Sequence, residues 1–336
     1  MASTPHTETW ARRDLLGLEG LAPGEVRAIL HRATELGPRV DGATFGTELA
    51  GRIVATLFFE NSTRTRVSFA VAATRLGAAV VDAGGSASSV TKGETLIDTA
   101  RNVEAMGVDA LVVRAGQVGA AATIADHVER CTVINAGDGR HEHPTQGLLD
   151  AYALCDALGK LETCDLSGVR VAIVGDIVSS RVARSSAWGL KALGAEVVLV
   201  GPPSLAPKSL TALGCRVEHD FERVIAEGLD AVMMLRIQFE RHGAGGAAIP
   251  SVRAYRADYG LTCERASRLR GRSGNDGVIV MHPGPINRGV EMDREVADGL
   301  LDTVQSVVLR QVKSGVAVRM AALDLCVAAR DRMLTR

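Results

Sequence analysis

The stretch FFENSTRTR, Phe58 to Arg66, is where hydroxyl and guanidinium side chains first follow an apolar run. A turn from a strand into a helix needs one capping hydroxyl, which Ser62 or Thr63 can supply. The N–H groups and dipole of a helix start attract anions, and guanidinium groups form charge-assisted hydrogen bonds that suit phosphate oxygens. The pair Arg64 and Arg66 at this one turn therefore predicts a strongly anionic ligand. The simpler alternative is a capped helix with solvated arginines.

A second polar motif, HEHPTQ at residues 141–146, follows the apolar run 132–136. Two histidines and a glutamate could bind a metal ion, but no third ligand accompanies them, and Pro144 is typical of the first residue of a helix. We therefore favour an interpretation in which His143 and Gln146 point from a helix start towards a ligand and polarise its carbonyl group. A surface histidine without a role is the alternative.

Cationic side chains also end other apolar runs. Gly175 stands before a helix start, but the GxGxxG spacing is absent, so dinucleotide binding is weakly supported and Arg181 could hold a carboxylate instead. The prolines of HPGP, residues 282–285, stiffen a loop whose carbonyl groups can accept N–H bonds from an amide. The arginines at successive ends are Arg64, Arg66, Arg114, Arg181 and Arg236, the last followed by Gln238. Buried arginines need anionic partners. These five arginines therefore predict a substrate pair that carries a phosphate and carboxylates.

The elements that position these residues alternate between short apolar runs and helix-length segments. We expect strands at 52–59, 78–83, 110–114, 132–136, 169–175, 195–201, 215–218, 230–235 and 277–282. We expect helices at 63–77, 94–106, 144–158 and 181–193. Unbroken Val/Ile/Leu runs are typical of parallel strands buried on both faces. This pattern predicts an α/β fold of two doubly wound, Rossmann-like parallel-sheet domains with the active site in the cleft between them.

The domain boundary is expected near residues 135–160, since four strands precede it and about five follow. We predict a first domain at 1–145, completed by a C-terminal helix at about 310–336, and a second domain at 146–309. The last helical stretches, 293–313 and 316–333, have no strand after them. The segment 241–275 is rich in Gly, Arg and Ser, which predicts a long surface loop with a short helix.

The composition narrows the class of protein. A length of 336 residues favours two domains, and the net charge of -1 with 3% aromatic residues argues against general nucleic-acid binding. Neither a signal peptide nor a membrane-spanning apolar window is evident. The six cysteines form no CxxC pair, so we expect reduced thiols in a cytosolic protein rather than disulfides or a zinc site.

In their order and over nearly the whole chain, these motifs resemble the aspartate/ornithine carbamoyltransferase family. Ser-Thr-Arg-Thr at 62–65 is similar to its carbamoyl-phosphate motif, and His-Pro-Thr-Gln at 143–146 to its second motif. Arg114 stands where the family has a phosphate-binding arginine. SSVTKGET at 88–95 resembles a loop that, in the aspartate branch, enters the neighbouring subunit's active site. HPGP at 282–285 resembles the loop whose carbonyl groups hold the carbamoyl amino group.

The resemblance favours the aspartate branch. The ornithine enzymes carry a Cys-Leu-Pro loop where this chain has His-Pro-Gly-Pro. Arg181 and Arg236, with Gln238 after them, match the residues that hold aspartate in the aspartate branch. Two arginines repel the cationic side chain of ornithine and attract a dicarboxylate, so the charge argument agrees.

The implied reaction joins carbamoyl phosphate and L-aspartate to give N-carbamoyl-L-aspartate and phosphate, in de novo pyrimidine biosynthesis and with neither metal nor cofactor. The residues implied to bind carbamoyl phosphate are Ser62, Thr63, Arg64, Thr65, Arg114, His143, Gln146, Gly284 and Pro285. Those implied in catalysis are Arg64, Thr65, Arg114 and His143. Those implied to bind aspartate are Lys92, Arg181, Arg236 and Gln238.

The family's catalytic unit is a homotrimer with shared active sites, which implies that Lys92 and either Ser88 or Ser89 enter the neighbouring site. A cytoplasmic enzyme without nucleic-acid or membrane partners is implied, and binding of regulatory chains or a dihydroorotase stays open. The rival hypotheses are a carbamoyltransferase with another acceptor, such as ornithine or an acylated ornithine, and a silent relative that serves as a scaffold. A dinucleotide-binding oxidoreductase is the third.

Overall fold

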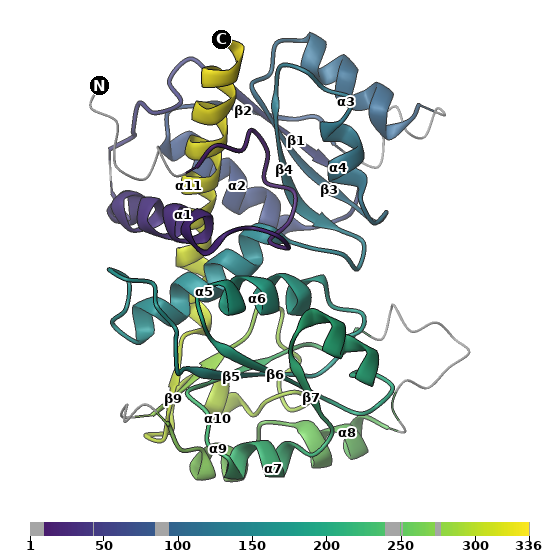
Figure 1. Cartoon of the computed structure of the whole chain (residues 1–336), viewed down its shortest axis with the longest axis vertical. Coiled ribbons are helices and arrows are strands. Elements are labelled where there is room, and N and C mark those ends of the chain that lie inside the picture. Colours follow the sequence, from purple (N-terminus) through teal and green to yellow (C-terminus); the bar gives the residue numbers. More distant parts are fainter. Residues whose placement is uncertain are drawn as a thin grey trace. The chain divides into compact units, whose positions relative to one another are not determined.

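The computed structural model describes residues 10–42, 44–84, 94–238, 249, 251–272 and 277–335. The chain divides into two compact units, which we call unit 1 (residues 1–149 and 313–336) and unit 2 (residues 150–312). Each unit contains one sheet in which all paired strands are parallel (Figure 1). The predicted class of two parallel-sheet α/β domains is therefore confirmed.

Unit 1 has a four-stranded sheet in the order β2-β1-β3-β4. Its strands are β1 Ile53–Phe58, β2 Ala79–Asp82, β3 Ala110–Ala115 and β4 Thr132–Asp138. Its helices are α1 Pro23–Leu36, α2 Thr63–Arg75, α3 Leu96–Ala105 and α4 Ala120–Ala125, with a short 3-10 helix at Gly37–Arg39. Leucine, valine and alanine side chains from β1, β3 and β4 pack with those of α3 and α4 in one buried cluster.

Unit 2 has a six-stranded sheet in the order β10-β9-β8-β5-β6-β7. Its strands are β5 Arg170–Val174, β6 Glu196–Val200, β7 Arg216–Glu218, β8 Ala231–Met234, β9 Val278–Met281 and β10 Val304–Ser306. Its helices are α6 Arg181–Ala192, α7 Phe221–Ala226, α8 Val252–Tyr259, α9 Cys263–Arg268 and α10 Arg294–Ala297, with a 3-10 helix at Lys208–Leu213. Helices α5 Pro144–Ala157 and α11 Val308–Leu334 contribute residues to both units.

Both strand orders contain a switch point, where the chain changes direction across the sheet. In unit 1 it lies between β1 and β3, and in unit 2 between β5 and β8. Ligands of open α/β sheets bind at the carboxyl ends of the strands at such a point. These two edges are therefore the positions at which each unit is expected to bind a ligand.

Two expectations for the C-terminal region were wrong. The predicted helix 293–313 instead contains the four-residue helix α10 and the strand β10, which pairs with β9. Gly299, with φ +69, lies between α10 and β10 in a left-handed conformation that favours glycine and ends the helix. From Val308 onwards one helix of 27 residues, α11, replaces the two predicted helical stretches.

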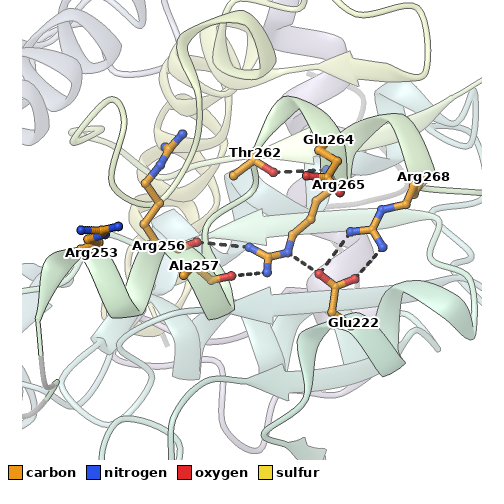
Figure 2. A pocket seen from close by; sticks show the side chains of 8 residues that line it. All are labelled: Glu222, Arg253, Arg256, Ala257, Thr262, Glu264, Arg265 and Arg268. Carbon is orange, nitrogen blue, oxygen red and sulfur yellow. Dashed lines mark hydrogen bonds and ion pairs between the residues drawn. The ribbon is translucent and has the colours of Figure 1, made fainter.

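The segment 241–275 contains two helices, α8 and α9, rather than one. Its Arg265 is buried, and its guanidinium donates to the Glu222 carboxylate at 2.7 Å (Figure 2). The same guanidinium donates to the Gly260 carbonyl at 2.7 Å. Arg268 forms a second ion pair with Glu222 at 2.9 Å, beside a cavity of about 390 Å³. Long-range partners therefore order a stretch whose composition predicted mostly loop.

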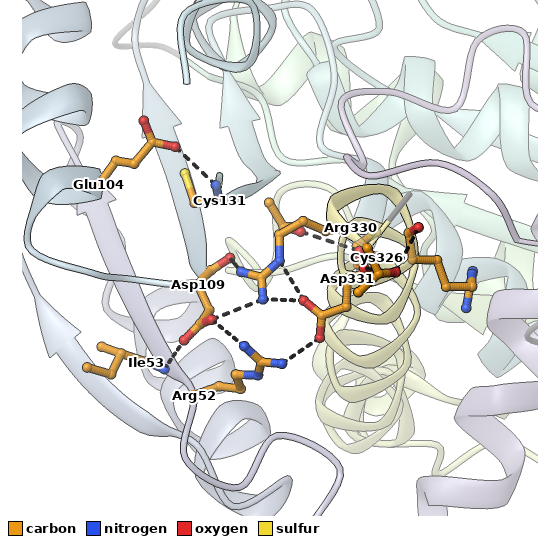
Figure 3. A network of polar contacts seen from close by, with 11 residues as sticks. Arg52, Ile53, Glu104, Asp109, Cys131, Cys326, Arg330 and Asp331 are labelled. Carbon is orange, nitrogen blue, oxygen red and sulfur yellow. Dashed lines mark hydrogen bonds and ion pairs between the residues drawn. The ribbon is translucent and has the colours of Figure 1, made fainter. Parts of the chain in front are cut away.

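Ion pairs attach the end of α11 to the sheet of unit 1 (Figure 3). Arg330 donates to both the carbonyl and the carboxylate of Asp109, at 2.6 and 3.0 Å. Arg52 bridges Asp109 and Asp331, at 3.0 and 2.6 Å. Buried Arg330 thus has carboxylate partners, as a buried charge requires. In the described part of the chain, no helix, α11 included, is long and apolar enough to cross a membrane.

Candidate active site

The first candidate site lies at the switch point of unit 1, where β1 and β3 are neighbours. Phe58, the last residue of β1, is in register with Arg114 of β3. The N–H of Phe59 donates to the carbonyl oxygen of Arg114 at 2.8 Å. The turn that follows β1 and the Arg114 residue are therefore brought together at one edge of the sheet.

This turn leads directly into α2. Ser62 occupies the N-cap position with φ −160, and its hydroxyl makes no capping hydrogen bond. Thr63 and Arg64 are exposed, whereas Thr65 is buried. Since the first N–H groups of an α-helix have no acceptor within the helix, a start that lacks a side-chain cap suits an external anion. The geometry therefore agrees with an anion site at residues 62–65.

Arg66, the second arginine of the predicted pair, has partners within the protein. Its guanidinium pairs with the Asp82 carboxylate at 3.0 Å and lies 5.2 Å from the centre of the Phe58 ring. Asp82 is the last residue of β2, the edge strand next to β1. Arg66 therefore contacts an acidic and an aromatic side chain of the protein, and a share of Arg66 in binding an anion stays a prediction.

Arg114 reaches from β3 towards both of its neighbours. Its Nη1 donates to the Ala136 carbonyl of β4 at 3.0 Å, and its Nε lies 3.5 Å from a Glu60 carboxylate oxygen in the turn after β1. Its side chain is only 13% exposed. These contacts hold the cation between the anion-binding turn and the loop that follows β4.

His143 and Gln146 lie at the start of α5. The helix begins at Pro144, as predicted. His143 and Gln146 are both buried, and the Gln146 N–H donates to the His143 carbonyl at 2.8 Å. A buried imidazole and a buried amide at one helix start can donate hydrogen bonds to a ligand with little competition from water.

Asp138 anchors the loop that leads to His143. This buried carboxylate accepts hydrogen bonds from the Gly119 N–H at 2.7 Å, the Asn135 amide at 2.9 Å and the Glu142 N–H at 3.0 Å. The sequence reasoning missed this residue. The motif Gly-Asp-Gly at 137–139, with an acid as the last residue of β4, is the signal that could have found it.

One group of potential metal ligands occurs here, made by Glu19, His141 and Glu142, whose ligand atoms lie within 4.8 Å of one another. The Glu142 carboxylate accepts the N–H groups of Leu18 at 2.9 Å and Glu19 at 3.1 Å. The His141 Nδ1 lies 3.0 Å from the Asp138 carboxylate. Hydrogen bonds within the protein thus hold the Glu142 carboxylate, and the His141 ring lies against Asp138.

The second candidate site lies at the switch point of unit 2. The Leu235 N–H, after β8, donates to the Val174 carbonyl of β5 at 2.8 Å. Gly175 follows β5 with φ +134, and a Cβ added there would lie 2.7 Å from the Leu235 carbonyl oxygen. Only glycine allows the two strand ends to approach this closely. The close approach brings the turn before α6 next to the residues that follow β8.

Arg181, Arg236 and Gln238 all belong to these two segments. Arg181 is the first residue of α6 and is buried, while Arg236 and Gln238 follow β8 and are partly buried. The buried Asp176 carboxylate accepts the N–H groups of Ser179 at 3.2 Å and Gln238 at 3.3 Å. Asp176, a second acid after a strand-end glycine, is another residue that the sequence reasoning missed.

Gly284 and Pro285 lie in the loop that follows β9 in unit 2. Gly284 has φ +68, a left-handed conformation that few other residues adopt. Gly284 is partly buried and Pro285 is exposed. The remaining predicted site residues, Ser88, Ser89 and Lys92, lie outside the described residues.

All six cysteines are free thiols, and five of them are buried. Burial raises the pKa of the Cys131 and Cys326 thiols, which keeps them protonated and unreactive at neutral pH. The expectation of buried, reduced thiols therefore agrees with the structure.

Two family models match the chain, and together they cover most of its length. Residues 13–156 match "Aspartate/ornithine carbamoyltransferase, carbamoyl-P binding domain", and residues 167–326 match "Aspartate/ornithine carbamoyltransferase, Asp/Orn binding domain". The match therefore includes both candidate sites.

Individual relatives of the chain belong to the same family. The aspartate carbamoyltransferase catalytic subunit of Myxococcus xanthus is 49% identical and covers 94% of this chain and 100% of its own length. That of Rhodospirillum rubrum is 50% identical and covers 94% of each chain. The crystal structure of aspartate transcarbamoylase from Trypanosoma cruzi with carbamoyl phosphate and aspartate has a TM-score of 0.79 at 28% identity, and covers 96% of this chain and 98% of its own.

Proposed function

The chain belongs to the aspartate/ornithine carbamoyltransferase family, and from this premise we propose that it is an aspartate carbamoyltransferase. It transfers the carbamoyl group of carbamoyl phosphate to the α-amino group of L-aspartate, which gives N-carbamoyl-L-aspartate and phosphate in de novo pyrimidine biosynthesis. The observation that carries the proposal is the repeated arrangement at two switch points, one with a phosphate-type helix start and Arg114, the other with Arg181 and Arg236.

The acceptor follows from charge. Arg181 follows β5 and Arg236 follows β8, and these two strands are neighbours in the sheet of unit 2. Two cations there attract a dicarboxylate and repel the ammonium group of ornithine. The relatives at about half identity are named aspartate carbamoyltransferases, which supports the same choice. Lys92 would add a third cation for the aspartate carboxylates, and Gln238 would assist.

The carbamoyl-phosphate residues act through position and electrostatics rather than through a covalent intermediate. Ser62, Thr63, Arg64 and Thr65 would hold the phosphate, and Arg64 would also stabilise charge on the leaving bridge oxygen. Arg114, Thr65 and His143 would polarise the carbonyl oxygen. Gln146 and the carbonyl groups of Gly284 and Pro285 would orient the NH2 group. The exposed Thr63 and Arg64 at the helix start, the largely buried Arg114 and the buried His143 support these roles.

Bond changes follow from these roles. The neutral α-amino group of aspartate attacks the carbonyl carbon and forms a tetrahedral intermediate. The bond to the bridge oxygen then breaks, and phosphate leaves with the electron pair. The departing phosphate accepts the proton that the nitrogen loses and is released as the dianion. No metal ion or other cofactor takes part in this scheme.

The test is carbamoyl transfer to L-aspartate, with L-ornithine in parallel and Arg64→Ala as the control. We expect turnover with aspartate alone and its loss in the variant. Turnover with ornithine would overturn the roles of Arg181 and Arg236 but leave the phosphate site standing. Turnover with neither acceptor would favour a silent relative that serves as a scaffold.

We further infer a cytoplasmic homotrimer with shared sites, supported by the motif SSVTKGET at 88–95 and by six free thiols. If Lys92 enters a neighbouring site, Arg64→Ala and Lys92→Ala trimers are each inactive. Dissociation and reassembly of a mixture should restore activity, because some sites then combine Arg64 of one chain with Lys92 of another. A mixture that stays inactive after reassembly would contradict shared sites.

A further inference from the structure

A buried histidine lies at the base of the loop that carries Gly284 and Pro285. The His282 side chain is 0% exposed and directly follows β9. Its Nδ1 accepts a hydrogen bond from the Gly284 N–H at 2.7 Å. Its own backbone N–H donates to the Gln311 side-chain oxygen at 2.9 Å. Hydrogen bonds on both sides therefore fix this histidine within unit 2.

The contact with Gly284 determines the protonation of the imidazole ring. A backbone N–H can only donate, so Nδ1 must present its lone pair and carries no proton. The neutral ring then has its proton on Nε2, which lies 3.3 Å from a carboxylate oxygen of Glu291. The Glu291 side chain is also 0% exposed, so this carboxylate faces the ring without competition from solvent.

Glu291 joins the two ends of the loop. The same oxygen that faces His282 accepts the Asn287 N–H at 2.5 Å. The loop from 282 to 291 is therefore held at Gly284 through the histidine and at Asn287 through the glutamate. Between these two points lie the carbonyl groups of Gly284 and Pro285.

The support extends away from the loop into the core of unit 2. Gln311, which accepts the His282 N–H, donates from its amide to the buried Asp150 carboxylate at 2.8 Å. The second Asp150 oxygen accepts the Ser186 hydroxyl at 2.7 Å. A continuous set of buried hydrogen bonds thus connects α5, α6 and α11 to His282, which gives the loop a rigid base.

We propose that His282 and Glu291 are positioning residues that aim the carbonyl groups of Gly284 and Pro285 at the NH2 group of carbamoyl phosphate. The inference rests on the proposed function, which assigns that NH2 contact to the two carbonyls. His282 acts through Nδ1, and Glu291 acts by holding the ring in the tautomer that leaves Nδ1 unprotonated. Neither side chain touches the substrate.

Two nearly isosteric variants test the role of Nδ1. In His282→Asn the side-chain oxygen can take the place of Nδ1 and accept the Gly284 N–H. In His282→Gln the amide can reach the place of Nε2, and the Gly284 N–H loses its acceptor. We expect His282→Asn to keep kcat within about fivefold of the wild type and His282→Gln to lose about 100-fold, the size expected when reacting groups are misplaced by about 1 Å.

A second pair of variants tests Glu291. Glu291→Gln keeps an oxygen that can accept from both His282 and Asn287, so it should retain most of the activity that Glu291→Ala loses. The KM for L-aspartate should change little in every variant. Equal loss of kcat in His282→Asn and His282→Gln, with both proteins folded, would mean that the histidine contributes only through packing. That result would overturn the proposal.

The tautomer gives a readout that does not depend on turnover. Long-range proton–nitrogen correlation spectra of protein with isotope-labelled histidine should show His282 protonated at Nε2 alone, and Glu291→Ala should disturb that signal. A proton on Nδ1 in the wild type would overturn the proposal. A wild-type protein that transfers no carbamoyl group would instead refute the proposed function, while the spectrum still decides the tautomer.

Discussion

The two candidate sites use the same structural unit in different ways. In each unit a buried strand leads through a turn into a helix, β1 into α2 and β5 into α6. The helices also end alike, since Gly77 and Gly194 adopt positive φ after them. The N–H groups of Ala78 and Ala195 return to carbonyl groups in the last turn of each helix, as in a Schellman motif.

The helix starts differ. The Ser62 hydroxyl makes no capping bond, whereas the Ser180 hydroxyl accepts the Ala183 N–H at 3.1 Å. The buried Asp176 carboxylate accepts a second N–H group of the turn before α6, that of Ser179. A helix start without a side-chain cap offers N–H groups and hydroxyls to a phosphate. A helix start whose N–H groups already have acceptors leaves the binding of a carboxylate to guanidinium groups. A phosphate site and a carboxylate site would thus require different turns.

The largest effect is expected at the arginine of the first turn. Arg64→Ala should lower kcat/KM about 1,000-fold, because it removes a cation from the developing charge on the bridge oxygen. Arg66→Ala is the matched control and should stay within about fivefold, because its surface ion pair with Asp82 is worth at most about 1 kcal/mol. Steady-state kinetics at saturating aspartate give both values. Equal losses would mean that both arginines face the anion after all.

The arginine after β8 should affect the other substrate. Arg236→Ala should raise the KM for L-aspartate about 10- to 100-fold, since a hydrogen bond to a charged group contributes about 1.5–3 kcal/mol. Binding of carbamoyl phosphate without aspartate, measured by calorimetry, should be unchanged. Arg223→Ala, at an exposed arginine of α7 in the same unit, is the control that should leave both constants alone. Weaker carbamoyl-phosphate binding in Arg236→Ala would refute the proposal that Arg236 binds aspartate alone.

The two N-cap serines should respond in opposite ways. Ser62→Ala should raise the KM for carbamoyl phosphate about tenfold, since a hydrogen bond to a charged group contributes at least about 1.5 kcal/mol, without changing stability. Ser180→Ala should lower the free energy of unfolding by about 1 kcal/mol, because it removes a formed cap. Urea unfolding and steady-state kinetics on both variants make the comparison. A loss of stability in Ser62→Ala would show that its hydroxyl caps α2.

The smallest effect concerns an internal ion pair that fixes α8 and α9 of unit 2. Asp293 accepts the Arg256 guanidinium at 2.6 Å and the Cys263 N–H at 2.9 Å. Burial alone would raise the pKa of the Asp293 carboxyl, but these hydrogen bonds outweigh it and lower the pKa. The stabilisation should therefore be complete above the unfolded pKa of about 4 and should be lost as the pH falls through the lower folded pKa.

Asp293→Asn measures this contribution. The variant should unfold about 0.5–1 kcal/mol more easily than the wild type in urea at pH 7 and pH 5. The difference should shrink below about pH 4. A difference that grows on acidification would mean that the folded pKa is raised instead.

Much of the fold could be read from local pattern. The nine predicted strands all occur, with ends within one or two residues, because unbroken runs of Val, Ile and Leu are typical of strands buried on both faces. Pro144 marked the start of α5 correctly. The edge strand β10 and one of the two helices α8 and α9 were missed, because their residues carry weak periodicity, and α9 is held by a distant partner, Glu222.

The candidate sites could be predicted less completely. The residue types at the strand ends, such as Arg114 and His143, were visible in the sequence, since their chemistry does not depend on the fold. The partner of Arg66 in α2 was not, because Asp82 lies on β2, 16 residues away. The anchoring roles of Asp138 and Asp176 were also hidden, because an acid at the end of a strand is common and the N–H groups that donate to it become evident only when the loops are folded.

By itself the sequence determined the elements, the chemistry at their ends and the family, because each is encoded in neighbouring residues. The tertiary structure decided which strand ends are neighbours, at the switch points β1/β3 and β5/β8. It also decided which arginines already have carboxylate partners and which tautomer His282 adopts. Strand order and buried hydrogen bonds join residues far apart in the chain, so no local pattern encodes them.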